Sequence, residues 1–384
     1  MKKLLIMAFA ASVFAACCNN GGAACDARNL DRAKATLDSI YAHYGVAENR
    51  LLRENYPFNV DYTASYLASA DQARPNPYSY LWPFSGTLSA VNTILEADAS
   101  YRSVLDGRVL PGLAEYLDTT RMPAAYASYI NTASASDRFY DDNVWLGIDF
   151  CDIYEATGDK KYLAEAEMIW KFIESGTDDV LGGGIYWCEQ QKHSKNTCSN
   201  APGTVYALKL YAATGDERYL AQGKALYAWT KKHLLDPEDG LYFDNIGLDG
   251  RIGRAKFAYN SGQMVQAGAL LYKATGDESY LKDAQRTAAA CYDRICSYAE
   301  NIVNVGAALE KEYGIPIVNK RVSITPASLL TSNFAGKETV LAKKLDEAAK
   351  NVGVDFLGGY SALVQKGMTS YERSFIESIP EALA

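Results

Sequence analysis

The protein has 384 residues, of which 48% are hydrophobic, and a formal net charge of −8. A chain of this length can bury a large core, in one big domain or in two smaller ones. The acidic balance and the lack of a basic patch or of a recognised nucleic-acid-binding motif argue against a nucleic-acid partner. Aromatic residues are abundant, with 28 Tyr, 12 Phe and 5 Trp, and such side chains either fill cores or offer flat surfaces to sugar rings.

The N-terminus has the pattern of an export signal. Lys2 and Lys3 precede an apolar stretch, LLIMAFAASVFAA, that ends at Cys17. This stretch is too short to span a bilayer and has the flanks of a signal peptide. Because small residues precede Cys17, the pattern resembles a bacterial lipoprotein signal, although Phe14 stands where Leu is usual and cleavage elsewhere is the alternative. We expect an exported protein that is lipid-anchored through Cys17 in the bacterial cell envelope, in the periplasm or at the cell surface.

Export bears on the interpretation of the cysteines. Of the eight cysteines, Cys188 and Cys198 are candidates for closing a loop with a disulfide, because exported proteins form such bonds. The cysteine spacing does not match a metal site, and the histidines, His43, His193 and His233, are scattered along the chain. The sequence therefore predicts that the protein binds no metal.

Helical patterning begins near Arg28 and continues to Tyr41. A Tyr- and Pro-rich stretch follows, and then a second helix, entered through Trp82 and Pro83, has the sequence YLWPFSGTLSAVNTILEA and the composition of a buried element. Residues 104–131 indicate one or two weaker helices. The early part of the chain is thus predicted to be helical.

The stretch DRFYDDNVWLGIDF, residues 137–150, places two adjacent carboxylates, Asp141 and Asp142, before a run that is apolar all round. Asp or Asn before an apolar run is where a helix starts, because the side-chain oxygens cap unpaired N–H groups. A helix that is apolar on every side must be buried on every side. We therefore expect the pair at the mouth of a buried helix. The alternative is that the two acids only cap this helix and favour its dipole.

Three copies of one motif follow, YEATGDKKYLAEA, LYAATGDERYLAQG and LYKATGDESYLKDA, with TGD starting at positions 157, 214 and 275. The steps of 57 and 61 residues are in the range expected for helical-hairpin repeats. Gly158, Gly215 and Gly276 are predicted to end one helix in the left-handed conformation. The Asp that follows each glycine is predicted to cap the next helix.

The two helices of each hairpin differ in pattern. After each TGD the helix is apolar on one side, as at Tyr162, Ala166, Ile169 and Ile173. Before each TGD it is apolar nearly all round, as in VYALKLYAA and MVQAGALLYKA. One-sided helices outside and fully apolar helices inside describe a double-layered α-barrel. The predicted fold class is therefore mainly α.

In such a barrel all inner helices point the same way, so their N-termini gather at one rim. The connections LGGGIYWCEQ and GLYFDNIGLDG are predicted to reach the same rim. A rim with polar groups, many aromatics and few charges is typical of a carbohydrate site. The predicted substrate-binding residues are Trp82, Tyr140, Asn143, Trp187, Asn200, Tyr242, Asp244, Asn245, Tyr259 and Asn260.

Paired carboxylates are the working groups of most glycosidases: one protonates the leaving oxygen, and the other attacks or activates water. The motifs YDDNVWLG, GGGIYW, NAPG, GLYFDNI, YNSGQM and TGDxxYL, in this order over about residues 28–290, resemble glycoside hydrolase family 76. That resemblance implies an (α/α)6 barrel and the activity of endo-α-1,6-mannanases and related transglycosylases. It also implies a retaining mechanism with Asp141 as nucleophile and Asp142 as acid/base, a mannan-type polysaccharide or oligosaccharide as partner, and no cofactor.

Structural roles are the alternatives for several of these residues. The alternative for Trp187 and Tyr259 is that they are core aromatic residues. The alternative for Asn200 and Asn260 is that they only cap helices. An epimerase-type α-barrel is a second enzymatic hypothesis, but sugar isomerases of that kind rely on several barrel histidines. Because only His193 falls in a predicted rim loop, that hypothesis ranks below the glycosidase.

The hairpin pattern stops near Cys296, at about the ninth of the helices of the predicted barrel. EYGIPIVNKRVSIT is strand-like and rich in β-branched residues, and VGVDFLGGYSALVQKG indicates a strand followed by a glycine turn. AENIVNVG, GIPIVNKRVSITP, LDEAAKNVGVDFLGGYSALVQKG and SIPEALA resemble the PFL family, also called domain of unknown function 711. This resemblance covers about residues 291–384 and carries no site.

The sequence therefore predicts four parts: a signal peptide at 1–17, a tether at 18–27, an incomplete (α/α)6 barrel at 28–292, and a small α/β fragment at 293–384. The two families make an unusual pair, because one is exported and the other cytosolic. A chimeric reading frame, with its seam within AAACYDRICSYAE, is the favoured explanation, and a real fusion is the alternative. A truncated barrel also predicts lost activity, which leaves a non-catalytic glycan-binding relic as the rival to an active enzyme.

Overall fold

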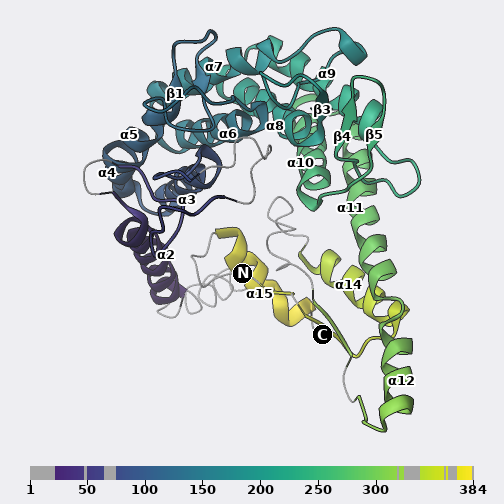
Figure 1. Ribbon diagram of the computed structural model, residues 1–384. Coiled ribbons are helices and arrows are strands. Elements are labelled where there is room, and N and C mark those ends of the chain that lie inside the picture. Colours follow the sequence, from purple (N-terminus) through teal and green to yellow (C-terminus); the bar gives the residue numbers. More distant parts are fainter. Residues whose placement is uncertain are drawn as a thin grey trace, which may run out of the picture. The chain divides into compact units, whose positions relative to one another are not determined.

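Figure 1 shows the computed structural model of the protein. The structure describes residues 22–46, 50–64, 75–317, 320–323, 338–358, 360–361 and 370–382. The predicted signal peptide and its Cys17 lie outside these residues. The chain divides into two compact units, one formed by Ile40–Ser297 and the other by Met1–Ser39 with Tyr298–Ala384.

The inner layer of the larger unit consists of helices that are buried on several sides. These are α3 (Leu81–Ala97), α6 (Tyr140–Thr157), α8 (Thr197–Thr214) and α10 (Ala258–Thr275). They form a row in which α3 packs on α6, α6 on α8 and α8 on α10. Within the described residues the inner layer thus has fewer helices than the six that the name (α/α)6 implies. The predicted mainly α fold class is confirmed, whereas the truncation of the barrel stays a prediction.

The outer helices follow the TGD turns. They are α7 (Lys160–Ser175), α9 (Glu217–Leu234) and α11 (Glu278–Ala299). Gly158, Gly215 and Gly276 adopt φ values of +68°, +71° and +72°, which a residue with a Cβ rarely tolerates. In all three turns the Asp after the glycine, Asp159, Asp216 or Asp277, accepts a hydrogen bond from the backbone N–H two residues on. The hairpin chemistry predicted from the sequence is confirmed.

The segment before α6 is less regular. α2 (Gly22–Tyr44) precedes α3, and a broken helical stretch follows α3: η2 (Ala99–Tyr101), α4 (Arg102–Val104), η3 (Leu105–Val109), α5 (Leu110–Leu113) and η4 (Ala114–Tyr116). This stretch contains the weak helices predicted within 104–131. β1 (Leu117–Asp118) then pairs antiparallel with β2 (Ala125–Tyr126).

Backbone hydrogen bonds bring the first residues of the inner helices together at one end. The N–H of Leu81, where α3 begins, donates to the carbonyl of Ser128, whose N–H donates to the carbonyl of Asp137. Next to α8, β3 (Ser194–Asn196) pairs antiparallel with β4 (Asn245–Gly247), and β4 pairs with β5 (Ile252–Gly253). The long connection before α8, which includes η5 (Val180–Gly182), and the one before α10 are therefore joined by this sheet.

The smaller unit contains the predicted α/β fragment. Its elements are α12 (Ile302–Tyr313), β6 (Arg321–Ser323), α14 (Glu338–Val352), β7 (Phe356–Gly358) and α15 (Ser370–Ala382). β6 and β7 pair in parallel, and α14 packs on α15 and on β7. The mixed α/β character predicted for the C-terminal segment is confirmed. In the part of the chain that the structure describes, no helix has both the length and the apolar character needed to cross a membrane.

Candidate active site

Asp141 lies in the first turn of α6, and side chains from two other segments hold its carboxylate. The indole N–H of Trp187 donates to Oδ2 at 2.9 Å, and the thiol of Cys198 donates to the same oxygen at 3.4 Å. Oδ1 accepts the backbone N–H of Asp142 at 3.0 Å. The N-cap of α6 is Phe139, which makes no side-chain cap. The geometry therefore favours a held carboxylate over the alternative of a capping residue.

Asp142 has a different environment. Its side chain is half-buried like that of Asp141, but among the described residues no hydrogen bond to its carboxylate is recorded. Burial and then the neighbouring charge of Asp141 raise the pKa of Asp142 well above its ordinary value. Burial also raises the pKa of Asp141, but the hydrogen bonds from Trp187 and Cys198 act against that rise. The environments thus separate the two carboxyls, with the proton favoured on Asp142 and the charge on Asp141.

Buried amides tie the first turns of α6 and α8 to the neighbouring backbone. The side chain of Asn143 accepts from Tyr126 N–H and donates to Tyr126 C=O, both at 2.9 Å. Asn200 does the same with Ile185, at 2.7 and 2.8 Å. Because both amides are 0% exposed, they fix the rim instead of facing a substrate as predicted. These bonds hold the first turns of the two helices in place.

Tyr140 and Tyr242 are core residues, which also corrects their prediction as substrate-binding. The ring of Tyr140 is buried and stacks on Phe172 with centroids 4.5 Å apart. Tyr242 is buried, and its backbone N–H donates to the hydroxyl of Ser261 in α10 at 3.1 Å. Ser261 thus has the linking role in α10 that Asn200 has in α8.

Asp244, Asn245 and Tyr259 lie on the same end of the inner layer as the acid pair. Asn245 donates to the carboxylate of Asp244 at 2.8 Å, and both side chains are half-buried. The pKa of Tyr259 is raised by burial and then by nearby Cys198, Asp244 and Asp141. Its ring is 49% exposed. The alternative of a core position for Tyr259 is therefore wrong.

The three remaining residues that were predicted to bind substrate, Trp82, Trp187 and Asn260, differ in their exposure to solvent. Trp82, at the start of α3, is 52% exposed. Trp187 is half-buried, packs against Phe139 with the ring centroids 5.1 Å apart and the planes tilted by 54°, and donates to Asp141. Asn260 is fully buried, and neither polar atom of its amide has a hydrogen-bond partner among the residues that the structure describes. Asn260 therefore does not face solvent, contrary to its prediction as a substrate contact.

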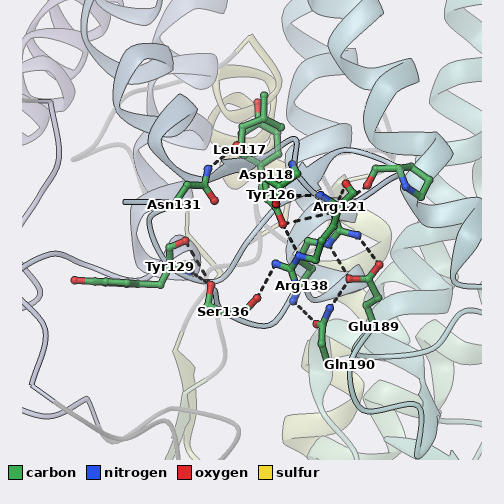
Figure 2. Close-up of polar contacts among 12 residues, drawn as sticks. Leu117, Asp118, Arg121, Tyr126, Tyr129, Asn131, Ser136, Arg138, Glu189 and Gln190 are labelled. Atoms are coloured by element: carbon green, nitrogen blue, oxygen red, sulfur yellow. Dashed lines mark hydrogen bonds and ion pairs between the residues drawn. The ribbon is translucent and has the colours of Figure 1, made fainter. Parts of the chain in front are cut away.

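Arg138 was not predicted as a functional residue from the sequence, although it supports the site. Figure 2 shows its polar contacts with Glu189 and Arg121. Its side chain is 0% exposed. Its Nε donates to Glu189 Oε2 at 2.7 Å, and its Nη1 donates to the carbonyls of Arg121 and Pro123 at 3.1 and 2.9 Å. Gln190 accepts the backbone N–H of Arg138 at 2.8 Å. No motif signalled these contacts, because Glu189 and Gln190 lie about fifty residues from Arg138 in the chain, and Arg121 and Pro123 contribute only backbone carbonyls.

The Arg138–Glu189 pair joins the two segments that carry Asp141 and Trp187. The backbone N–H of Tyr140 donates to the carbonyl of Trp187 at 2.9 Å, and Glu189 N–H donates to Arg138 C=O at 3.0 Å. Burial alone would raise the pKa of Glu189, but the Arg138 guanidinium holds it below its ordinary value. The pair therefore keeps the indole of Trp187 within reach of Asp141.

Lys195 fixes the glycine-rich connection in a similar way. The side chain is fully buried, and its ammonium donates to Asp178 Oδ1 at 2.8 Å and to the carbonyls of Val180 and Gly183 at 2.8 and 2.6 Å. A buried ammonium with three acceptors is a satisfied structural cation. The disulfide considered for Cys188 and Cys198 is not formed, since both thiols are free.

Comparison with protein families gives two matches. Glycosyl hydrolase family 76 matches residues 62–313, and an uncharacterised family, DUF711, matches residues 275–384. Curated relatives of the second segment are UPF0210 proteins, of Corynebacterium glutamicum (53% identical over 100 residues, 26% of this chain) and Desulforamulus reducens (52% over 103 residues, 27% of this chain). The chain spans only 22% and 23% of the length of these two relatives.

Solved structures resemble the chain over a longer range. An α-mannanase of family 76 from Bacteroides thetaiotaomicron is 29% identical, with a TM-score of 0.61, over 72% of this chain and 72% of that chain. A family 76 mannosidase from the same organism is 26% identical, with a TM-score of 0.62, over 92% of this chain and 85% of that chain. An inactive variant of an α-1,6-mannanase of a Salegentibacter species, in complex with α-1,6-mannotriose, is 24% identical, with a TM-score of 0.53, over 92% of this chain and 86% of that chain, and shares the fold.

Proposed function

The chain belongs to glycosyl hydrolase family 76, and from this premise we propose that it is a glycoside hydrolase that cleaves α-1,6-linked mannan by a retaining, two-carboxylate mechanism. The observation that carries the proposal is the unequal environment of the two acids. Asp141 is held by two side-chain donors, whereas Asp142 has a pKa raised by burial and by the charge of Asp141. That inequality is what a nucleophile and a proton donor need.

The reaction would run in two steps. In the first, Asp141 bonds to the anomeric carbon, and the glycosidic bond breaks as Asp142 gives its proton to the leaving oxygen. In the second, the ionised Asp142 takes a proton from water, the water oxygen bonds to the anomeric carbon, and Asp141 leaves as a carboxylate. One water is consumed for each bond cleaved, and both acids return to their starting states.

The substrate class is supported by the relatives and by the aromatic rim. The solved relatives include an α-mannanase and a mannosidase. Tyr259 and Trp82 are large aromatic side chains that are about half exposed, as a flat sugar ring requires. The decisive experiment is incubation of the purified chain with α-1,6-mannan, followed by chromatography of the products. Mannan oligosaccharides support the proposal, and an unchanged polymer at high enzyme concentration contradicts it.

The activity is expected to depend on pH in a bell-shaped manner. On the acid side kcat/KM should fall as Asp141 takes up a proton, and on the alkaline side as Asp142 loses one. Because burial and the charge of Asp141 raise the pKa of Asp142, the alkaline limb should lie well above the ordinary carboxyl range of about 4. A pH profile of kcat/KM measures both limbs. A rate that stays level into the alkaline range would contradict Asp142 as the proton donor.

A second candidate function is glycan binding without turnover, either by a relic or by a chimeric product. It is favoured by the short inner layer and by the family match of the C-terminal segment, which spans about a fifth of its relatives' length. Binding of α-1,6-mannan in titration calorimetry without any released product would favour it. Amplification of genomic DNA across codons 280–310 tests the chimera directly, because a real fusion gives one continuous frame.

We further propose that the protein is exported and lipid-anchored through Cys17, on the pattern of Lys2, Lys3 and the apolar stretch that follows them. Replacing Cys17 with Ala should move the protein from the membrane fraction to the soluble periplasmic or culture fraction, because the acyl anchor is lost. Immunoblots of fractionated cells measure this change. An unchanged membrane fraction would contradict the anchor, and Cys18→Ala is the control for a general effect of thiol loss.

A further inference from the structure

Cys198 lies at a repeated position of the inner helices. It is the second residue of α8, as Asp141 is the second residue of α6 and Tyr259 the second residue of α10. Its side chain is 7% exposed, and its Sγ lies 3.4 Å from Asp141 Oδ2. The same repeat position thus places the thiol of Cys198 in α8 against the carboxylate of Asp141 in the neighbouring inner helix, α6.

The thiol of Cys198 is in the state needed to donate. Burial, followed by the charge of Asp141, raises its pKa well above the ordinary value, so it keeps its proton at neutral pH. A thiolate at this distance would repel the carboxylate, whereas a protonated thiol donates to it. The other titratable groups that interact with Asp141 or Cys198 come from α6, the connection before α8, the segment next to β4, and α10: Asp142, Cys188, Asp244 and Tyr259.

The hydrogen bonds distinguish the two oxygens of Asp141. Each carboxylate oxygen has two lone pairs. On Oδ2, Trp187 and Cys198 engage both. On Oδ1 the backbone N–H of Asp142 engages one. Counting the donors among the described residues, Oδ1 is therefore the oxygen with a lone pair left to form a bond.

Resting on the proposed function, we propose that Cys198 is a positioning residue that, together with Trp187, holds Oδ2 of Asp141 and leaves Oδ1 to attack the anomeric carbon. When the Oδ1–carbon bond forms, Oδ2 becomes the carbonyl oxygen of the ester. When that bond breaks, the electron pair returns to the carboxylate, and the two donors stabilise the charge that develops on Oδ2. Cys198 thereby stabilises the ionised carboxylate of Asp141 before the ester forms, and again when Asp141 leaves the anomeric carbon.

Replacement of Cys198 with Ala is expected to lower kcat about tenfold, equivalent to about 1.4 kcal/mol, and to leave KM nearly unchanged. The acid limb of kcat/KM should move to higher pH, since the ionised form of Asp141 loses one donor. Cys198→Ser should restore the limb and most of kcat, because a hydroxyl donates in place of the thiol. Cys151→Ala is the matched control: Cys151 is also a free, buried cysteine and lies further along α6, and its loss should change neither quantity.

A titration of the Asp141 carboxyl by ¹³C NMR separates the inference from the proposed function. The signal is assigned with Asp141→Asn, and the pKa should be higher in Cys198→Ala than in the wild-type chain. If the wild-type chain turns over no mannan but this pKa difference is found, the proposed function falls and the positioning role stands. If the Ala variant keeps both the wild-type pH limb and the wild-type carboxyl pKa, the positioning role is overturned.

Discussion

Replacing Asp141 with Asn is expected to abolish formation of the glycosyl-enzyme while leaving the fold nearly intact. The amide cannot attack the anomeric carbon, but its oxygen can still accept the indole N–H of Trp187. Mass spectrometry after incubation with an activated fluoromannoside should show the covalent adduct in the wild-type chain and none in the variant. The melting midpoint should change little, because Asp141 is only half-buried.

Asp142→Asn should also be severe, with kcat lowered about 10²- to 10⁴-fold on the polymer. On a substrate with a good leaving group most of the first step should recover, because such a group needs no proton. Asp149→Asn is the matched control, since Asp149 lies about two turns further along α6 and accepts from Ser89 and Asn92. Near-wild-type activity in Asp141→Asn or in Asp142→Asn would contradict the catalytic roles and favour the alternative that the two acids only cap α6.

The second large effect is expected at Arg138, whose replacement with Ala should destabilise the larger unit by about 3–5 kcal/mol. The guanidinium is fully buried and bonds to Glu189 and to the carbonyls of Arg121 and Pro123. Removing it takes the guanidinium donors from the Glu189 carboxylate, which keeps only the side-chain amide of Gln190, and from the two carbonyls. It also breaks the link between the segments of Trp187 and Asp141. Chemical denaturation followed by tryptophan fluorescence measures the loss.

Two further variants identify the cause of that loss. Arg138→Met combined with Glu189→Met should be less destabilising than either single change, because the pair is then replaced by apolar groups instead of being broken. Arg218→Ala removes an exposed partner of Asp216 and should leave the denaturation midpoint unchanged. If the effects of the two single changes simply add in the double variant, the two residues act independently, which would contradict the role given to the Arg138–Glu189 pair.

Much of the fold follows from short-range patterns in the sequence. The TGD repeats specify a left-handed glycine and a capping Asp at Gly158 and Asp159, and again at Gly215 and Asp216, and both are found. The same patterns distinguished the helices that are apolar all round from those with one apolar side. The break near Cys296 also followed from composition, since β-branched residues replace the hairpin pattern there, and the parallel pair β6–β7 is the result.

The side-chain roles at the rim were harder to predict. Asn143 and Asn200 were predicted to bind substrate, but the side-chain amide of each is hydrogen-bonded to neighbouring backbone. An Asn at a helix start has the same sequence signature whether it binds a ligand or a loop, because both need the same donor and acceptor. The sequence did not signal the roles of Arg138 and Cys198, and it indicated a disulfide for Cys198, since their partners, Glu189 and Asp141, lie far from them in the chain.

The sequence by itself determined the hairpin repeat, the buried inner helices, the change to an α/β segment and the position of the acid pair at a helix start. These depend on residues within a turn or two of one another, where propensity and periodicity act directly. Only the tertiary structure decided which oxygen of Asp141 is engaged, which asparagines are buried, and that Arg138 with Glu189 aligns Trp187. Those outcomes depend on which distant segments pack together, and burial then fixes both the hydrogen-bond partners and the proton affinities of the groups that meet.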